Sequence, residues 1–196
     1  MIILGIDPGF AIVGFGVVEK DARGKCHCID YGAIETQSTE AFPKRLQKIS
    51  KGMKILIDRY KPDAVAVEEL FFQNNTSTAI PVAEARGVII ASCIEQTENL
   101  FEYTPNQIKL ATTGTGNADK HQVQQMTKYI LGLKNVPKPD DAADALAVAI
   151  THAQTNSQVA QSSMFEKLAR GQKAKGSIPK NNQNKQLRVR KSSISK

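Results

Sequence analysis

Acidic residues close two short apolar segments of this sequence, at the points where buried β-strands are expected to end. The run IILGID ends in Asp7, directly before Pro-Gly, and the run DAVAVEEL carries Glu68 and Glu69 behind its apolar residues. An acidic side chain in such a place is costly unless it is paired or bound to a cation. Because active sites of α/β sheets gather at the carboxyl ends of parallel strands, Asp7 and Glu68 are candidates for one site.

A third acidic group follows in the segment PDDAADALA, residues 139–147. Asp141 and Asp144 are three positions apart, which places them on one face of an alanine-rich helix. The alanines allow this helix to press closely against the sheet. If the helix docks beside the strand ends, Asp7, Glu68, Asp141 and Asp144 converge.

Four carboxylates in one pocket repel one another, and such an arrangement is typical of a site for hard cations. Mg²⁺ and Mn²⁺ prefer oxygen ligands, and two such ions together clamp the attacking and leaving oxygens of a phosphoryl centre. The alternative is that Asp140 and Asp141 only cap a helix N-terminus, where the helix dipole favours acidic residues. We favour capping for Asp140, whereas Asp144 lies one turn further in, where capping explains it less well.

Hydrophobic periodicity predicts the elements that position these acids. A hairpin turn is expected at residues 21–24 and a glycine-containing loop at residues 113–116. The expected strands cover residues 2–7, 10–19, 25–35, 63–70 and 100–103, and the expected helices cover residues 42–59, 77–96, a short stretch after Pro105, 119–131 and 140–153. This order predicts an α/β domain with a mixed sheet covered by helices.

Charge divides the chain of 196 residues into two parts. Residues 1–155 carry 16 Lys or Arg and 18 Asp or Glu, whereas residues 156–196 carry ten and one, so the second part supplies the whole net charge of +7. Its richness in Gln, Asn, Ser, Lys and Gly is typical of a disordered segment. We therefore predict a folded domain at residues 1–155 and a basic, largely disordered C-terminal tail at residues 156–196. The tail is expected either to touch phosphates without specificity or to keep the protein soluble.

Membrane and secreted proteins do not fit this composition. No apolar run approaches the roughly 18 consecutive residues of a transmembrane helix, and the short apolar N-terminus lacks the basic start of a signal peptide. Three cysteines are too few for a disulfide framework, and in a strand Cys26 and Cys28 would face away from His27 rather than bind a metal with it. We expect a cytoplasmic protein without membrane contact.

Five sequence blocks, in order along residues 1–155, resemble one known family. They are GIDPGFAIVGFGVV at residues 5–18, AVEELFFQNNTSTA at 66–79, EARGV at 84–88, QIKLATTGTGNADKHQVQQM at 107–126 and DDAADALAVAITH at 140–152. The blocks are similar to those of the RuvC family of Holliday-junction resolvases, the crossover junction endodeoxyribonucleases.

The resemblance implies an α/β, RNase H-like fold, with a mixed five-stranded sheet of three antiparallel strands and then two parallel strands, flanked by helices. Residues 1–155 would then be a nuclease domain. The family works as a homodimer that nicks two opposed strands of a four-way DNA junction in homologous recombination and DNA repair, leaving 5′-phosphate and 3′-hydroxyl ends. The RuvA–RuvB branch-migration complex is a further implied partner.

The resemblance also assigns roles to the acids. The implied catalytic and metal-binding residues are the four already named, Asp7, Glu68, Asp141 and Asp144, with two Mg²⁺ per subunit for which Mn²⁺ substitutes. It favours Glu68 over Glu69 and Asp141 over Asp140. Strand alternation agrees in the first case, because neighbouring strand residues face opposite sides and only one of Glu68 and Glu69 can point inward.

DNA contacts are implied at four further positions. Phe71 would stack on an unpaired base at the junction crossover, a contact worth roughly 1–3 kcal/mol per base, unless its ring packs in the core. Lys109 and Lys120 match basic residues near the scissile strand and would hold a phosphate, or they are ordinary solvated lysines. Arg86 is either a DNA contact or a structural residue. A weaker candidate for phosphate contacts is a basic strip on the first predicted helix, Lys44, Arg45, Lys48 and Lys51.

Three other functions compete with this interpretation. A sugar-kinase or actin-like phosphotransferase shares the sheet topology and has a similar first phosphate loop, but it normally needs two such domains and residues 1–155 supply one. A junction-binding scaffold without catalysis has no reason to keep four repelling acids. A related nuclease for another substrate, such as RNA in a hybrid, is disfavoured by the block around Phe71.

Overall fold

Five strands form a single mixed sheet in the order β3-β2-β1-β4-β5. The computed structural model describes residues 1–70 and 76–155. Three strands pair in antiparallel fashion, β1 (Ile2–Asp7), β2 (Ile12–Lys20) and β3 (Cys26–Glu35). On the other side of β1, β4 (Ala64–Glu68) and β5 (Leu100–Tyr103) add in parallel. The predicted sheet, three antiparallel strands followed by two parallel ones, is confirmed.

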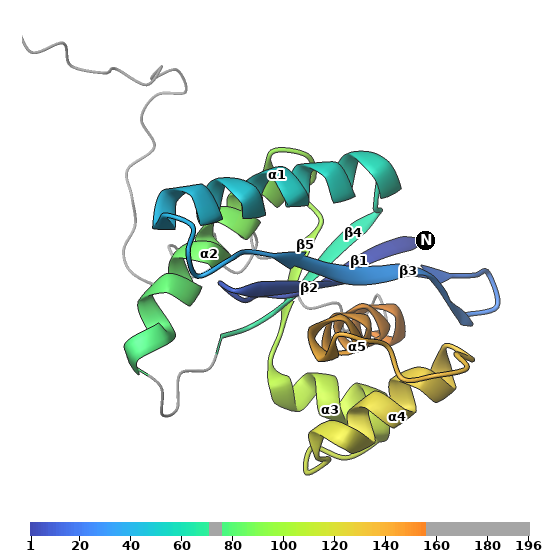
Figure 1. The fold of residues 1–196 in the computed structure, drawn as a ribbon. Helices are drawn as coiled ribbons and strands as arrows, with labels where there is room; N and C mark the ends of the chain where they lie inside the picture. The colour runs from blue at the N-terminus through green and yellow to red at the C-terminus, as the bar shows by residue number, and fades with distance from the viewer. Residues whose placement is uncertain (71–75, 156–196) are drawn as a thin grey trace, which may run out of the picture.

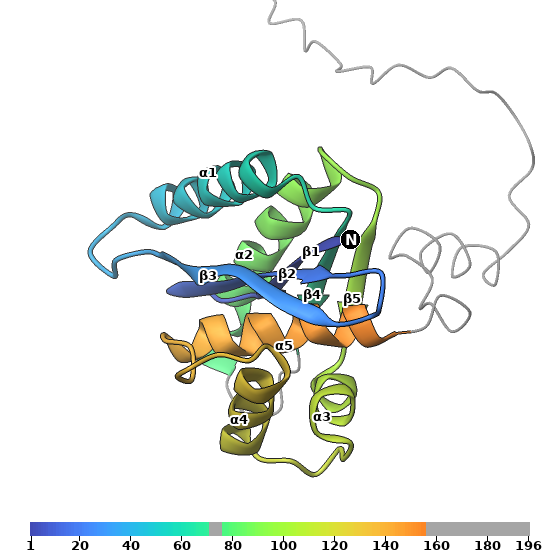
Figure 2. The ribbon, with the colours of Figure 1, turned by 90° about the vertical axis from the view of Figure 1, so that its right-hand side faces the viewer.

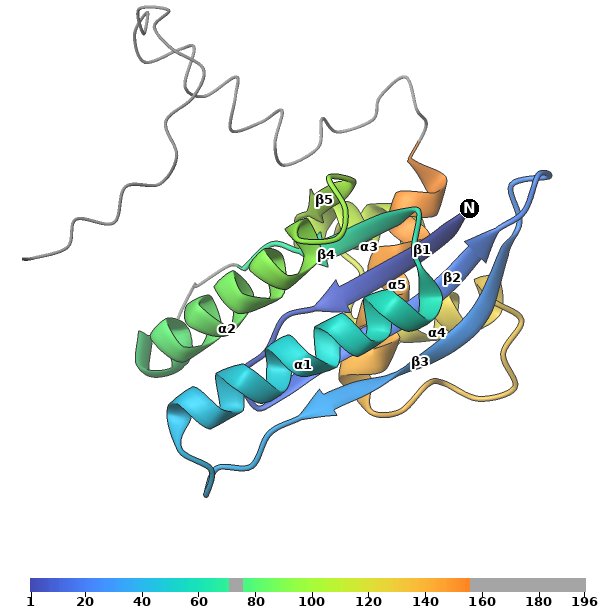
Figure 3. The same cartoon turned by 90° about the horizontal axis from the view of Figure 1, so that it is seen from above.

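Helices cover both faces of this sheet, as Figure 1 shows. On one face, α1 (Phe42–Tyr60) and α2 (Thr76–Ile94) lie side by side, which is clearest from above (Figure 3). On the opposite face, α5 (Asp140–Gln154) runs along the sheet, with α3 (Pro105–Thr113) and α4 (Lys120–Ile130) packed on its outer side (Figure 2). None of the helices within the described residues is long and apolar enough to cross a membrane.

The element bounds differ from the predicted ones by at most two residues, as in β2, α2 and β4. Strand β4 begins at Ala64 rather than 63, and the carboxylate of Asp63 instead accepts a hydrogen bond from the Ile2 amide at 2.6 Å. It ends at Glu68, which pairs with Tyr103 of β5. The end of β4 therefore coincides with an acidic side chain, as the interpretation of the site requires.

Alternation along the central strands divides the core into two layers. Leu4 and Ile6 of β1 and Val65 and Val67 of β4 pack in the layer under α1 and α2. The intervening positions, such as Ile3, belong to the layer under α5. Because Asp7 and Glu68 continue the second register, their side chains leave the sheet on the α5 face.

Glycines on that face allow α5 to approach the strands closely. A Cβ atom at Gly5 would lie 2.2 Å from the carbonyl oxygen of Ala145, and one at Gly16 would lie 2.7 Å from Cγ of Leu146. Side chains at these positions would push α5 away. The glycines of β1 and β2 and the alanines of α5 therefore act together to set the distance between the helix and the strand ends.

The Cys-His-Cys segment behaves as a strand, which agrees with its predicted alternation. Cys26 is buried, while His27 is exposed and its Nε2 lies 3.2 Å from Oδ2 of Asp21. The three cysteines are free thiols.

Candidate active site

Asp7 and Glu68 are the last residues of the neighbouring parallel strands β1 and β4. Their side chains share the α5 face of the sheet. The charge of Glu68 acts on Asp7, and the charge of Asp144 acts on both carboxylates. Glu69, one residue further on, interacts electrostatically with Arg86 of α2. This placement agrees with the choice of Glu68 over Glu69.

Asp141 and Asp144 reach the same place from the first turns of α5. In the β1–β2 register Asp7 pairs with Gly14, and a Cβ atom at Gly14 would lie only 2.0 Å from the carbonyl oxygen of Asp141. The beginning of α5 therefore lies directly over the strand residue beside Asp7. Gly14 was not predicted from the sequence to be part of the site, although a glycine inside a strand often marks a close backbone approach.

The electrostatics of this acidic cluster (Asp7, Glu68, Asp141 and Asp144) follow from burial and like charge. Burial raises the pKa of Asp7 well above its usual range, and the charges of the other three acids raise it further. Burial, followed by the charge of Asp144, raises the pKa of Glu68 to about 7. Burial and mutual repulsion thus disfavour the charged forms of Asp7 and Glu68 in the absence of a cation.

Lys120, the first residue of α4, supplies positive charge to the cluster. Its Nζ lies 2.9 Å from Oδ2 of Asp144 and 4.0 Å from Oδ2 of Asp140. The hydrogen bond to Asp144 raises the pKa of Lys120, while burial still raises the pKa of Asp144. A capping box fixes the start of α4 at Lys120: the side chain of Asp119 accepts a hydrogen bond from the Gln122 amide, and the side chain of Gln122 accepts one from the Asp119 amide.

A pocket of about 200 Å³ opens beside the cluster, between the end of β4 and the three helices α3, α4 and α5. It brings together four of the residues singled out in the sequence, two acids and two lysines, with an apolar wall. Its lining residues are Glu68, Asp144, Lys109, Lys120, Pro105, Ile108, Val123 and Ala147. The apolar wall of α3 and α4 was not identified from the sequence, because only the tertiary structure sets these helices beside α5.

Asp140 does not cap α5, so the capping prediction for this residue is wrong. The N-cap residue is Pro139, and it makes no side-chain cap hydrogen bond. Asp140 lies in the first turn and accepts a hydrogen bond from Nζ of Lys138 at 2.5 Å, which holds its pKa below the usual range. A local ion pair therefore occupies Asp140, while Asp141 contributes to the charge around Asp7.

Arg86 has a structural partner. Its guanidinium forms an ion pair with Glu102 of β5, and the two side chains are only 21% and 13% exposed. This pair joins α2 to the edge strand of the sheet. The placement favours the structural interpretation of Arg86 over a DNA contact. Phe71 and the predicted tail at residues 156–196 lie outside the described residues.

The donor set of the cluster fits hard cations. All four candidate ligands are carboxylates, which Mg²⁺ and Mn²⁺ prefer, and burial together with like charge raises the pKa values of Asp7, Glu68 and Asp144. Within residues 1–70 and 76–155, however, no three His, Cys, Asp or Glu side chains are arranged to hold a metal ion as they stand. Asp144 is directed at Lys120 in this arrangement.

Comparison with known proteins identifies relatives along nearly the whole described part of the chain. A family model described as "Crossover junction endodeoxyribonuclease RuvC" matches residues 3–152. A protein of that name from Alkaliphilus metalliredigens is 54% identical over 153 residues, covering 78% of this chain and 93% of the relative. One from Brevibacillus brevis is 53% identical over 154 residues, covering 79% and 92%.

Solved structures show the same architecture. Thermus thermophilus RuvC in complex with Holliday junction substrate matches with a TM-score of 0.74 and 37% identity, over 78% of this chain and 93% of that one. The yeast mitochondrial Holliday junction resolvase Ydc2 matches with a TM-score of 0.56 at 16% identity, over 77% and 78%, which is a likeness of fold alone. The predicted RNase H-like fold is confirmed. The matches also favour a nuclease over the phosphotransferase alternative.

Proposed function

Because the chain belongs to the RuvC family of crossover junction endodeoxyribonucleases, we propose that it is a Holliday-junction resolvase. It nicks two opposed strands of a four-way DNA junction during homologous recombination and DNA repair, leaving 5′-phosphate and 3′-hydroxyl ends. The observation that carries this proposal is the meeting of Asp7, Glu68, Asp141 and Asp144 at the carboxyl ends of β1 and β4. Support for the substrate comes from the related Thermus protein, whose structure contains a Holliday junction.

The reaction uses divalent cations, two Mg²⁺ per subunit, for which Mn²⁺ substitutes. The four carboxylates of the acidic cluster would hold them. The chemistry that such ions supply is Lewis-acid activation of water and stabilisation of negative charge on the phosphate. Asp144, which contacts Lys120 Nζ at 2.9 Å, would be one of the ligands, and Lys120 compensates negative charge in the cluster and would be available to a DNA phosphate.

Lys109 and Lys120 contact the DNA backbone beside the scissile phosphate. Both line the pocket next to Glu68 and Asp144, where a phosphate brings negative charge to two ammonium groups. Lys120 is 58% exposed while it pairs with Asp144, so it reaches solvent and acid at once. Phe71, in the segment directly after Glu68 and Glu69, stacks on an unpaired base at the crossover.

The active form is a homodimer, because paired incision needs two equivalent sites on symmetry-related strands. Helices α1 and α2 carry exposed apolar side chains that suit this contact. Ile80 and Ile94 of α2 are 69% and 41% exposed, and Ile55 of α1 is 64% exposed. The RuvA–RuvB complex is a further partner, and the basic segment at residues 156–196 adds contacts to phosphates. The protein acts in the cytoplasm.

A cleavage assay on labelled DNA tests this proposal. Wild type and Asp7→Asn are incubated with a four-way junction and with a linear duplex of the same sequence, in Mg²⁺ or EDTA. Asp58→Asn, an exposed acid on α1, is the matched control. We expect paired nicks in the junction only, from wild type and Asp58→Asn and only with Mg²⁺, while Asp7→Asn binds the junction without cutting it.

Other outcomes point to the competing functions. Binding without cleavage in both Mg²⁺ and Mn²⁺ would support the scaffold. Cleavage of an RNA–DNA hybrid in preference to the junction would support a nuclease with another substrate. If the wild type neither binds nor cuts the junction, the proposed substrate is wrong.

A further inference from the structure

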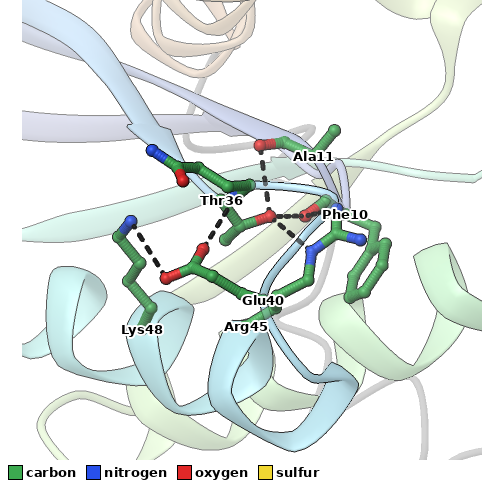
Figure 4. A network of polar contacts seen from close by, with 7 residues as sticks. Phe10, Ala11, Thr36, Glu40, Arg45 and Lys48 are labelled. Atoms are coloured by element: carbon green, nitrogen blue, oxygen red, sulfur yellow. Dashed lines mark hydrogen bonds and ion pairs between the residues drawn. The ribbon is translucent and has the colours of Figure 1, made fainter.

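The side chains of Thr36 and Arg45 contact the turn that follows Asp7 and hold it in place (Figure 4). The hydroxyl of Thr36, just after β3, donates to the carbonyl oxygen of Phe10 at 2.8 Å, and the Thr36 amide donates to that of Ala11 at 2.8 Å. The same hydroxyl accepts a hydrogen bond from Nε of Arg45 on α1 at 2.9 Å. Thr36 is almost fully buried, since only 8% of its surface is exposed.

Arg45 also contacts Phe10 directly, both at its ring and at its carbonyl oxygen. Its guanidinium carbon lies 3.6 Å from the centre of the Phe10 ring, and its Nη2 lies 3.5 Å from the Phe10 carbonyl oxygen. The Phe10 ring also packs against Phe42 of α1, at a centroid distance of 5.0 Å. The guanidinium is thus directed at the turn, which does not fit the predicted role of Arg45 in a phosphate-contact strip.

The next residues of that strip behave differently. Lys48 is exposed, and its Nζ lies 3.6 Å from Oε1 of Glu40, whose other carboxylate oxygen accepts a hydrogen bond from the Gln37 amide at 2.6 Å. This pair braces the connection between Thr36 and α1 (Figure 4). Arg45 alone among the charged residues of this network touches the turn after Asp7.

The backbone at Asp7 depends on this support. Pairing of β1 with β4 ends at Ile6 and Val67, so Asp7 is paired on one side only, with Gly14 of β2. Beyond it the chain leaves the sheet through a tight turn, in which a Cβ atom at Gly9 would lie 2.0 Å from the carbonyl oxygen of Ile12. The contacts of Phe10 therefore fix the backbone on the C-terminal side of Asp7.

We propose that Thr36 and Arg45 are positioning residues for Asp7, which hold the turn at residues 8–11 so that the Asp7 carboxylate stays in the acidic cluster. This inference rests on the proposed function, in which Asp7 binds divalent cations. Like charge on the neighbouring acids favours displacement of an ionised Asp7 from the cluster. The contacts that hold the turn at Phe10 oppose this displacement.

Four substitutions test the inference. Arg45→Ala removes all contacts of the guanidinium with Thr36 and Phe10. Arg45→Lys keeps the charge but loses the planar group that binds Thr36 and the Phe10 ring. Thr36→Val removes the hydroxyl, and Thr36→Ser restores it. The matched control is Arg59→Ala, because Arg59 also lies over an aromatic ring, that of Tyr60 at 5.1 Å, but at the opposite end of α1.

The main measurement is Mn²⁺ affinity without DNA, by titration calorimetry. Junction affinity in EDTA at several salt concentrations, the single-turnover cleavage rate at saturating junction and the thermal unfolding midpoint accompany it. We expect Arg45→Ala, Arg45→Lys and Thr36→Val to weaken Mn²⁺ binding and slow cleavage by about tenfold, the lower end of the range for groups that orient metal ligands. Thr36→Ser and Arg59→Ala should stay within about twofold of wild type in both.

Two results would overturn the inference. If Arg45→Ala lowers junction affinity and reduces the salt slope by about 0.9 with unchanged Mn²⁺ affinity, Arg45 is a phosphate contact. If the unfolding midpoint falls but Mn²⁺ affinity and the cleavage rate at low temperature do not, the network is only structural. Failure of the proposed function is distinguishable, because wild type would then bind Mn²⁺ without cutting the junction.

Discussion

Replacing Glu68 with Gln should stabilise the fold while abolishing cleavage. Burial and the charge of Asp144 raise the pKa of Glu68 from 4.5 in the unfolded chain to about 7. The folded state therefore binds the proton more tightly than the unfolded state. Stability is highest below the unfolded pKa and falls as the pH rises through 7.

The magnitude follows from the difference between the two pKa values. One pKa unit corresponds to about 1.4 kcal/mol, so ionised Glu68 destabilises the cation-free protein by roughly 3 kcal/mol above neutral pH. Gln has nearly the same shape and no charge. Glu68→Gln should recover most of this energy at about pH 8 and less than about 1 kcal/mol at about pH 5, where the folded wild type is already protonated.

Urea unfolding in EDTA at these two pH values measures the effect, and junction cleavage in Mg²⁺ measures the loss of function. Glu98→Gln is the control, because Glu98 is exposed, and it should change stability by no more than about 0.5 kcal/mol. The reasoning is refuted if Glu68→Gln is no more stable than wild type at the higher pH. A gain that is equal at both pH values would also refute it, since the effect would then not come from ionisation.

Three further predictions concern the frame of the site and the basic tail. Gly14→Ala places a Cβ atom 2.0 Å from the Asp141 carbonyl oxygen and should cost about 1–3 kcal/mol on urea unfolding and slow cleavage, whereas Gly87→Ala, with nothing within 4 Å, should do neither. Arg86→Ala leaves Glu102 largely buried and unpaired, so the protein should lose about 2–3 kcal/mol of stability while its junction affinity, measured by gel shift, is unchanged. Truncation after Thr155 removes ten Lys or Arg. The slope of log affinity against log salt should become shallower by about 0.9 for each DNA phosphate that the tail neutralises. An unchanged slope would leave only the solubilising role for the tail.

Local pattern was sufficient to predict the order and type of the elements. Apolar alternation and helical spacing depend on neighbours within a few positions, so they predicted all five strands and five helices in the right order. Alternation also required that only one of Glu68 and Glu69 point inward, and the family resemblance favoured Glu68. The spacing of Asp141 and Asp144 likewise requires only a helix, and their alanine neighbours indicated that this helix packs closely. Where elements end was predicted less well, as at residues 63–70, because pairing with another strand decides it.

The sequence by itself thus determined the strands, the helices and the acids that the strands and helix α5 carry. Only the tertiary structure decided the partner of each charged side chain. Arg45 and Lys48 are both basic residues of the same predicted strip. In the structure, Arg45 packs on the Phe10 ring in the turn after Asp7, whereas Lys48 forms an ion pair with Glu40. Likewise, Glu102 of β5 forms an ion pair with Arg86 of α2. The physical reason is that each of these contacts joins elements far apart in the chain, and hydrophobic periodicity specifies which face of an element is buried but not which residue of another element meets it.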